Sequence, residues 1–224
     1  ILFPICGNLP ANTYTLNGQS YTLKQHGFAR ELPWEVVDQA TDDRASITLS
    51  LTSNDQTRAV YPFDFQLLFT YTLEGNKLIA HQRYVNHSDS PMPFSAGFHP
   101  YFQVVDKAQL EVDIPADRLL DQQTKSEQPF DSTFDFERDE IDVAFTNLSR
   151  HSASITDRAQ GFRLTLAQSD EFSMIVFWTV KGKPFYCLEP WTAGRNALNT
   201  GERLLSLAPG DSLETVFSLT ADFL

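Results

Sequence analysis

Two short stretches combine an ionisable side chain with a proline and an aromatic residue. His99 stands in Phe-His-Pro-Tyr-Phe (98–102), and Glu189 stands in Cys-Leu-Glu-Pro-Trp (187–191). An imidazole titrates close to neutral pH, so His99 suits a general acid or a ligand. A carboxylate at the end of a buried strand is a stronger base than one in water. A core histidine hydrogen-bonded to a carbonyl and a glutamate facing water remain open as alternatives.

Strands should position both residues. Read as a strand, 94–102 places His99 and Tyr101 on one face, and Pro100 should end or bend the strand at a rim. Aromatic and β-branched residues dominate many other segments, which predicts further strands. These are 34–37, 46–51, 65–73, 77–86, 162–167, 172–180, 185–188, 204–207 and 213–219.

Turn signals separate these segments. Asn17-Gly18 between two β-prone runs predicts a tight hairpin, and 53–61 is expected to hold a short helical turn. The segment 121–142 is the least strand-like, and 122–129 is expected to be a loop. Its acidic end reads as a solvated edge, because no hard-cation loop pattern is complete there. The pattern predicts an all-β fold, a large antiparallel two-sheet β-sandwich.

Length and composition limit the class of protein. With 224 residues and 42% hydrophobic content, we expect a single domain over 1–224, although the apolar opening at Ile1 suggests that N-terminal strands before it are missing. A net charge of −12 argues against nucleic acid or an anionic membrane as partner. The two cysteines, Cys6 and Cys187, suggest neither a disulfide framework nor a zinc site. No apolar run is long enough to span a membrane and no signal peptide is evident, so a cytoplasmic location is expected.

Further side chains are candidates for ligand contacts. His26 and Arg30 stand in His-Gly-Phe-Ala-Arg (26–30), a segment that reads as a loop able to lay donors over a ligand. Arg30 offers a planar fork to hydroxyls or phosphate, although a surface ion pair is the alternative. Tyr101 and Trp191 could stack on the apolar face of a ligand or could equally fill the core.

Taken together, the motifs resemble the aldose 1-epimerase (galactose mutarotase-like) superfamily, nearest to its hexose-6-phosphate 1-epimerase branch. They run in that family's order along the whole chain. The motifs are Phe-Pro-Ile-Cys-Gly (3–7), His-Gly-Phe-Ala-Arg (26–30) with Trp34, Tyr-Pro-Phe-Asp-Phe (61–65), Phe-His-Pro-Tyr-Phe (98–102), Glu-Ile-Asp-Val-Ala-Phe (140–145), Cys-Leu-Glu-Pro-Trp (187–191) and Leu-Ala-Pro-Gly-Asp (207–211).

The resemblance implies a β-supersandwich and sugar-ring opening without a cofactor or a metal. His99 matches the family's catalytic acid and Glu189 its catalytic base. Arg30 matches a substrate-binding arginine, and Asp142 matches a carboxylate that binds sugar hydroxyls or steadies the site. Two departures stand beside this match. No other histidine clearly matches the second active-site histidine of some members, and the family's Arg-Gly-Gly segment would lie before Ile1.

The expected activity is therefore interconversion of the α and β anomers of an aldohexose or a hexose 6-phosphate. A non-catalytic carbohydrate-binding domain of the same fold is the alternative. The expected partner is a small-molecule sugar or sugar phosphate, bound by a monomer or weak dimer. Free and phosphorylated sugars both stay open, because Arg30 and loop cations would favour a phosphate while the net charge of −12 disfavours one.

Overall fold

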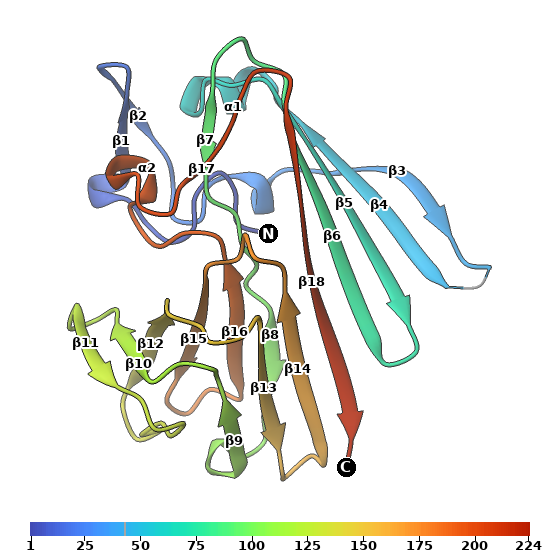
Figure 1. Ribbon diagram of the computed structural model, residues 1–224, viewed down its shortest axis with the longest axis vertical. Coiled ribbons are helices and arrows are strands. Elements are labelled where there is room, and N and C mark those ends of the chain that lie inside the picture. Colours follow the sequence, from blue (N-terminus) through green and yellow to red (C-terminus); the bar gives the residue numbers. More distant parts are fainter. Residues whose placement is uncertain (43) are drawn as a thin grey trace. The chain divides into compact units, whose positions relative to one another are not determined.

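β-Strands are the main regular structure in residues 1–42 and 44–224, which are the residues that the computed structural model describes (Figure 1). The strands are β1 (Thr13–Leu16), β2 (Gln19–Thr22), β3 (Glu35–Ala40), β4 (Ala45–Thr52), β5 (Phe65–Glu74), β6 (Lys77–Asn86), β7 (Met92–Phe94), β8 (Tyr101–Gln103), β9 (Leu110–Asp113), β10 (Arg118–Asp121), β11 (Ser126–Pro129), β12 (Glu140–Phe145), β13 (Ser152–Asp157), β14 (Phe162–Gln168), β15 (Met174–Val180), β16 (Phe185–Trp191), β17 (Leu205–Leu207) and β18 (Ser212–Phe223). The helical segments are short: α1 (Asp55–Val60), α2 (Ala197–Thr200) and the 3₁₀ turns η1 (Pro10–Asn12), η2 (Ala29–Glu31) and η3 (Lys107–Gln109).

Two large antiparallel sheets account for most of these strands. One sheet has six strands in the order β11-β10-β12-β15-β16-β8, and the other has eight in the order β3-β4-β5-β6-β18-β14-β13-β9. Two small sheets, β1-β2 and β17-β7, are also present. The predicted all-β, two-sheet fold class is confirmed.

The chain divides into two compact units, which are described separately below. Unit 1 consists of Ile1–Glu74, Ile79–Phe98 and Trp191–Val216, and unit 2 consists of Gly75–Leu78, His99–Pro190 and Phe217–Leu224. The chain therefore leaves unit 1 directly before His99 and leaves unit 2 directly after Pro190.

The core of unit 1 is aromatic. Alternate residues of β5 are buried, which places Phe65 and Phe69 on the inner face of the sheet. Phe3 is fully buried and lies against the rings of Phe28, Tyr61, Phe65, Tyr84 and Phe94. Large buried rings contribute much apolar area, so this cluster stabilises the sheet and holds the N-terminal segment in place.

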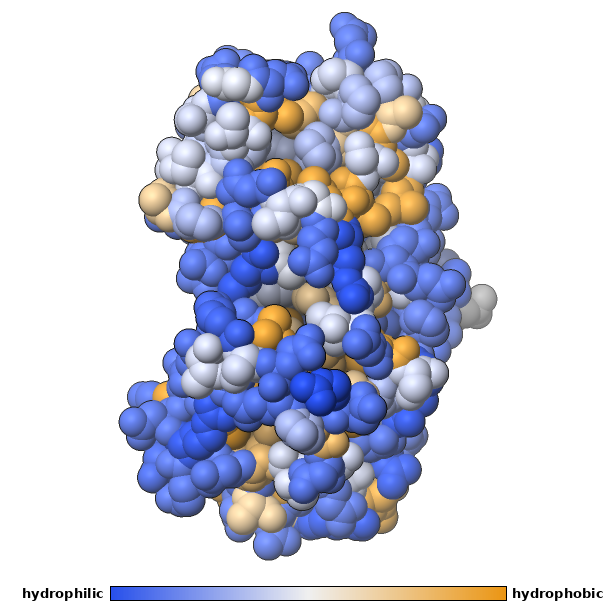
Figure 2. Space-filling model, turned by 60° about the vertical axis from the view of Figure 1, so that its left-hand side comes forward, coloured by the Kyte–Doolittle hydropathy of each residue, from blue (hydrophilic) through white to orange (hydrophobic). Residues whose placement is uncertain are grey.

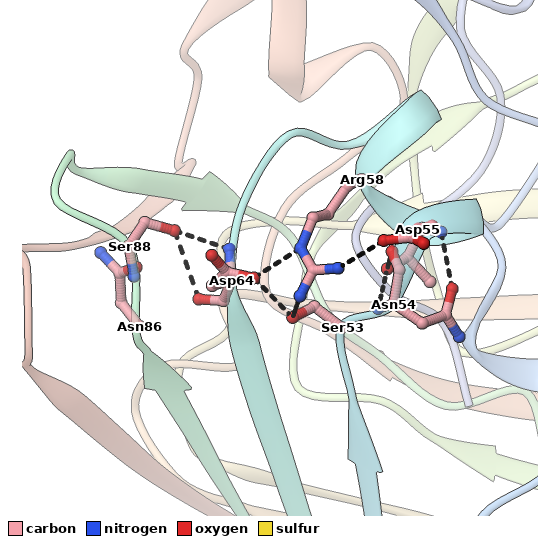
Figure 3. A network of polar contacts seen from close by, with 8 residues as sticks. Ser53, Asn54, Asp55, Arg58, Asp64, Asn86 and Ser88 are labelled. Atoms are coloured by element: carbon pink, nitrogen blue, oxygen red, sulfur yellow. Dashed lines mark hydrogen bonds and ion pairs between the residues drawn. The ribbon is translucent and has the colours of Figure 1, made fainter.

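A short helix and a polar network close one end of unit 1 (Figure 3). Asn54 caps α1, because its Oδ1 accepts from the Thr57 N–H at 3.0 Å while Thr57 Oγ1 accepts from the Asn54 N–H at 2.9 Å. Arg58 donates from Nε to Asp64 Oδ1 at 2.6 Å, immediately before β5. The predicted helical turn within 53–61 is confirmed.

The six-stranded sheet of unit 2 has two different faces. Along β12, Ile141, Val143 and Phe145 are buried, and so is the small Ala144, whereas Glu140 and Asp142 are half-buried. The apolar face continues in Phe177 and Tyr186, whose rings lie 6.1 Å apart and nearly parallel. The alternation of β12 leaves the opposite face free to carry polar side chains.

The Asn17-Gly18 turn forms as predicted. Leu16 pairs with Gln19, which leaves a two-residue loop, and both loop residues have positive φ (50° and 82°). Asn and Gly tolerate this conformation best, which is why they favour this hairpin turn.

Two strand predictions were wrong. The segment 94–102 is not one strand: β7 ends at Phe94, Gly97 makes only isolated bridges, and β8 begins at Tyr101. Pro100 lacks the N–H that a continuous ladder needs, so pairing resumes only after it. The segment expected as a loop, 122–129, contains β11, which forms a hairpin with β10. Its side chains are mostly polar and exposed, so no apolar alternation marked it.

The face shown in Figure 2 is mostly hydrophilic, and hydrophobic residues appear there as scattered patches. Cys6 and Cys187 are both buried and unbridged. Within the described residues, no helix has the length and apolar character needed to cross a membrane.

Candidate active site

Strand pairing gathers polar residues on one face of the six-stranded sheet in unit 2. Asp142 of β12 pairs with Trp178 of β15, and Cys187 of β16 pairs with Tyr101 of β8. Paired residues of adjacent strands project from the same face, and so do residues two apart along a strand. Glu189 therefore shares its face with Cys187.

His99 and Glu189 meet on this face. His99 Nε2 lies 3.4 Å from Glu189 Oε1. The Glu189 side chain is only 1% exposed and the His99 side chain 18% exposed. The carboxylate is thus withdrawn from water while the imidazole keeps an open edge. The two residues predicted from separate motifs, 90 positions apart, form one pair.

Aromatic side chains fix the orientation of the imidazole. The Tyr101 ring stacks on His99 with centroids 5.0 Å apart and planes 10° apart, and Trp178 meets His99 edge-on at 5.6 Å. Trp178 is itself held by a hydrogen bond from Nε1 to Glu140 Oε1, at 2.6 Å. Trp178 was not predicted as a site residue. Its only signal in the sequence is its place at the end of the apolar run 172–178.

Cys187 is a third member of the group. Donor atoms of His99, Cys187 and Glu189 all lie within 4.8 Å of one another. Burial and, secondly, the neighbouring Glu189 charge raise the pKa of the Cys187 thiol far above its ordinary value, so the thiol is neutral at physiological pH. Nothing in the sequence distinguished Cys187 from an inert core cysteine, because only the pairing of β16 with β8 brings it here.

In unit 1, His26 and Arg195 both contact Trp191. His26 is buried, its Nδ1 accepts the Gly7 N–H at 3.1 Å, and its Nε2 lies 3.3 Å from Gln25 Nε2. The His26 ring meets Trp191 edge-on at 5.7 Å. The guanidinium of Arg195, one of the loop cations that the sequence offers to a phosphate, lies over Trp191, 5.8 Å from the ring centroid. Trp191 is itself buried between these partners.

The loop that carries His26 depends on Gly27. Gly27 has a φ of +69°, and a Cβ there would lie 2.2 Å from the Phe3 carbonyl oxygen. Only glycine fits so close to another backbone segment in that conformation. The close approach anchors the loop to the buried N-terminal segment.

The remaining predicted residues have simpler surroundings. Arg30 lies in η2, is exposed, and donates from Nη2 to the Gln25 carbonyl at 3.2 Å. Asp142 is half-buried on the same sheet face as Trp178. The structure thus joins His99, Glu189 and Tyr101 directly within unit 2.

Comparison with known proteins assigns the family. The family model described as aldose 1-epimerase matches residues 2–220. The chain belongs to the aldose 1-epimerase family. The predicted resemblance is confirmed, since the family model matches nearly the whole chain.

Solved structures share this fold over the full chain. The Slr1438 protein from Synechocystis sp. PCC 6803 is 43% identical, with a TM-score of 0.97, over 100% of this chain and 77% of that one. A galactose mutarotase related enzyme from Lactobacillus acidophilus is 27% identical, with a TM-score of 0.86, over 98% of this chain and 81% of that one.

A curated relative gives a narrower likeness. A Salmonella typhimurium protein named "Putative glucose-6-phosphate 1-epimerase" is 34% identical over 103 residues, which cover 44% of this chain and 32% of that protein. The similarity to the phosphate-specific branch is therefore partial.

The arrangement suits proton transfer to and from neighbouring atoms. A carboxylate beside an imidazole stabilises the protonated, cationic ring, and removal of water from the carboxylate strengthens that attraction. The pair can hold one proton donor and one proton acceptor a few ångströms apart. That is the requirement of general acid–base catalysis at two adjacent oxygens.

Proposed function

We propose that this aldose 1-epimerase family member interconverts the α and β anomers of an aldohexose or hexose 6-phosphate by acid–base ring opening. The observation that carries the proposal is the 3.4 Å approach of His99 Nε2 to the buried Glu189 carboxylate. Family membership supports the reaction class.

The reaction needs two proton transfers, at the two oxygens that are bonded to C1. Glu189 takes the proton from the hydroxyl on C1, the bond between C1 and the ring oxygen breaks, and protonated His99 delivers a proton to that oxygen. The open aldehyde rotates about the C1–C2 bond, and the reverse transfers close the ring on its other face. Both oxygens are bonded to C1, so acid and base must act close together.

Burial prepares the two groups for opposite roles. Glu189 must accept a proton, and a carboxylate with little hydration does so more readily than one in water. His99 must start the cycle protonated, and the nearby negative charge stabilises that state. The proton gained by Glu189 and the proton lost by His99 return when the ring closes, so the enzyme is regenerated without a co-reactant.

The other predicted residues are proposed to bind the sugar. Tyr101 stacks on His99 and is 58% exposed, so its ring can also contact a sugar. Asp142 can accept bonds from hydroxyls, and the exposed Arg30 guanidinium can donate to hydroxyls or a phosphate. For His26 and Trp191, both buried in unit 1, contact with the sugar stays a prediction from the sequence.

The direct test measures anomer exchange. Polarimetry follows freshly dissolved α-glucose, and a coupled dehydrogenase specific for the β anomer follows α-glucose 6-phosphate. We expect wild type to accelerate at least one of the two, and Glu189→Gln to abolish most of that acceleration. The variant Glu214→Gln, which alters an exposed carboxylate beside a histidine, is the matched control and should equal wild type.

Calorimetry distinguishes the proposed enzyme from the alternative, a non-catalytic carbohydrate-binding domain. If wild type binds a sugar but accelerates anomer exchange of no aldose, the proposed enzymatic activity is rejected and a carbohydrate-binding domain is favoured. Equal rates in wild type and Glu189→Gln would reject the assigned base.

A further inference from the structure

Three different ligand atoms converge at the His99–Glu189 pair. His99 offers an imidazole nitrogen, Cys187 a sulfur and Glu189 a carboxylate oxygen, and the three lie within 4.8 Å of one another. Nitrogen, sulfur and oxygen from these side chains are the donors that Zn²⁺ binds in proteins, and sulfur selects against Mg²⁺ and Ca²⁺. Among the described residues this is the one such group of three or more His, Cys, Asp and Glu side chains.

The spacing suits a tetrahedral ion. Nitrogen and oxygen ligands about 2.0–2.1 Å from Zn²⁺ lie roughly 3.3–3.4 Å apart when the angle is tetrahedral. His99 Nε2 and Glu189 Oε1 lie 3.4 Å apart. A sulfur about 2.3 Å from the ion would lie roughly 3.5–3.6 Å from each of them, so Cys187 has to close by roughly 1.3 Å at most from the 4.8 Å limit.

We propose that His99, Cys187 and Glu189 bind a thiophilic divalent cation such as Zn²⁺, and that the bound ion inhibits the enzyme. The binding half stands on the three side chains alone, whereas the inhibition half rests on the proposed function. On binding, the Cys187 S–H bond breaks, a sulfur–metal bond forms and the proton leaves to solvent.

Inhibition follows from which atoms the ion occupies. A metal bond to His99 Nε2 uses the lone pair that would otherwise carry the acidic proton, and a bond to Glu189 uses the oxygen that would accept one. The proposed acid and base are thereby blocked together. Sugar binding by other residues does not relieve the block, because neither group can exchange a proton while it is coordinated.

The binding test uses Cd²⁺ as probe, because a cadmium–thiolate bond absorbs in the ultraviolet independently of any catalysis. When Cd²⁺ is titrated into wild type, with a phosphine present to keep the thiols reduced, this band should appear and saturate at one ion per chain. Cys6→Ser is the matched control, since Cys6 is the other buried, unbridged cysteine, and it should behave as wild type. Cys187→Ser should lose the band.

A second variant tests the metal site without changing Cys187, in case Cys187→Ser does not fold. His99→Asn changes a partly exposed side chain and leaves both cysteines in place, and it should weaken Cd²⁺ binding at least about 10-fold, in line with losses at metal sites. Circular dichroism checks that each variant is folded. A wild type without the band, a band that survives in Cys187→Ser, or unchanged affinity in His99→Asn would each overturn the proposed site.

The activity arm separates the two proposals. Zn²⁺ should slow anomer exchange by wild type in proportion to occupancy, and a chelator should restore the rate. Rates that Zn²⁺ at saturating occupancy leaves unchanged would overturn the inhibition. A protein that binds Cd²⁺ as expected and catalyses nothing would leave the metal site standing while the proposed function fails.

Discussion

Two histidine–carboxylate pairs in this protein have almost the same separation and very different surroundings. His99 Nε2 lies 3.4 Å from Glu189, and His81 Nε2 lies 3.5 Å from Glu214. The first pair is 18% and 1% exposed, and the second is 49% and 57% exposed. Distance alone does not distinguish the two, whereas burial does.

Solvent explains why the difference matters. Water and salt screen the exposed pair of β6 and β18, and such pairs contribute little to stability or reactivity. Around His99, Tyr101 and Trp178 replace part of the water with fixed rings. The comparison predicts that substitutions at the buried pair change chemistry and that matched substitutions at the exposed pair do not.

The largest expected effect is on turnover. Glu189→Gln should lower kcat for anomer exchange by about 10²–10⁴-fold, the usual contribution of one general acid or base. Sugar affinity measured by calorimetry should remain. The same substitution at Glu214 should leave kcat unchanged. A loss of activity in Glu214→Gln as large as in Glu189→Gln would break the comparison.

A second effect concerns pH. The base must be ionised and the acid protonated, so the rate should fall at both low and high pH and give a bell-shaped profile between pH 5 and 9. Whatever rate remains in His99→Asn should lack the alkaline decline, because that decline reports loss of the histidine proton. His81→Asn should keep both limbs. A flat wild-type profile over this range would count against the pair.

The same contrast of buried and exposed charges applies to stability. Asp121 is 1% exposed and accepts from Arg138 Nη2 at 2.6 Å and from the Gln123 and Thr124 N–H groups at 2.9 and 3.0 Å. Burial alone would raise the pKa of Asp121, but these donors hold it below the ordinary value. Asp121→Asn should cost about 1–3 kcal/mol in urea unfolding at neutral pH.

The lowered pKa predicts how the stability difference between wild type and Asp121→Asn changes with pH. Because the folded pKa of Asp121 is lowered, its stabilisation is complete above the unfolded value near ~4 and is lost as pH falls through the folded value. The gap between wild type and Asp121→Asn should therefore shrink in acid. Glu111, paired with Arg158 on the surface, is the control, and Glu111→Gln should leave the unfolding midpoint unchanged.

The smallest effect tests the ring that orients the imidazole. Tyr101→Leu removes the stack on His99 and should lower kcat by about 2–10-fold, the equivalent of the roughly 0.5–1.5 kcal/mol of an aromatic pair. Tyr101→Phe keeps the stack and should retain wild-type kcat. Equal losses in both variants would assign the effect to the phenol hydroxyl instead.

Most of the fold was predictable, because local signals specify it. The Asn17-Gly18 turn, the helical turn near Asn54 and most long strands follow from residue preferences over a few positions. Strand β11 was missed, since a polar, exposed strand carries no apolar alternation. The break between Phe94 and Tyr101 was misread because isolated bridges at Gly97 depend on residues far away in the sequence.

By itself, the sequence determined the family, the all-β class and the two ionisable residues most suited to acid–base chemistry, because each rests on residue types and short spacings. Only the tertiary structure decided that His99 and Glu189 lie 3.4 Å apart, that Trp178 and Tyr101 hold the imidazole, and that Cys187 joins them. Those facts depend on the register of β15, β16 and β8. Register is set by nonlocal pairing and burial, and a shift of one residue would turn each side chain to the opposite face.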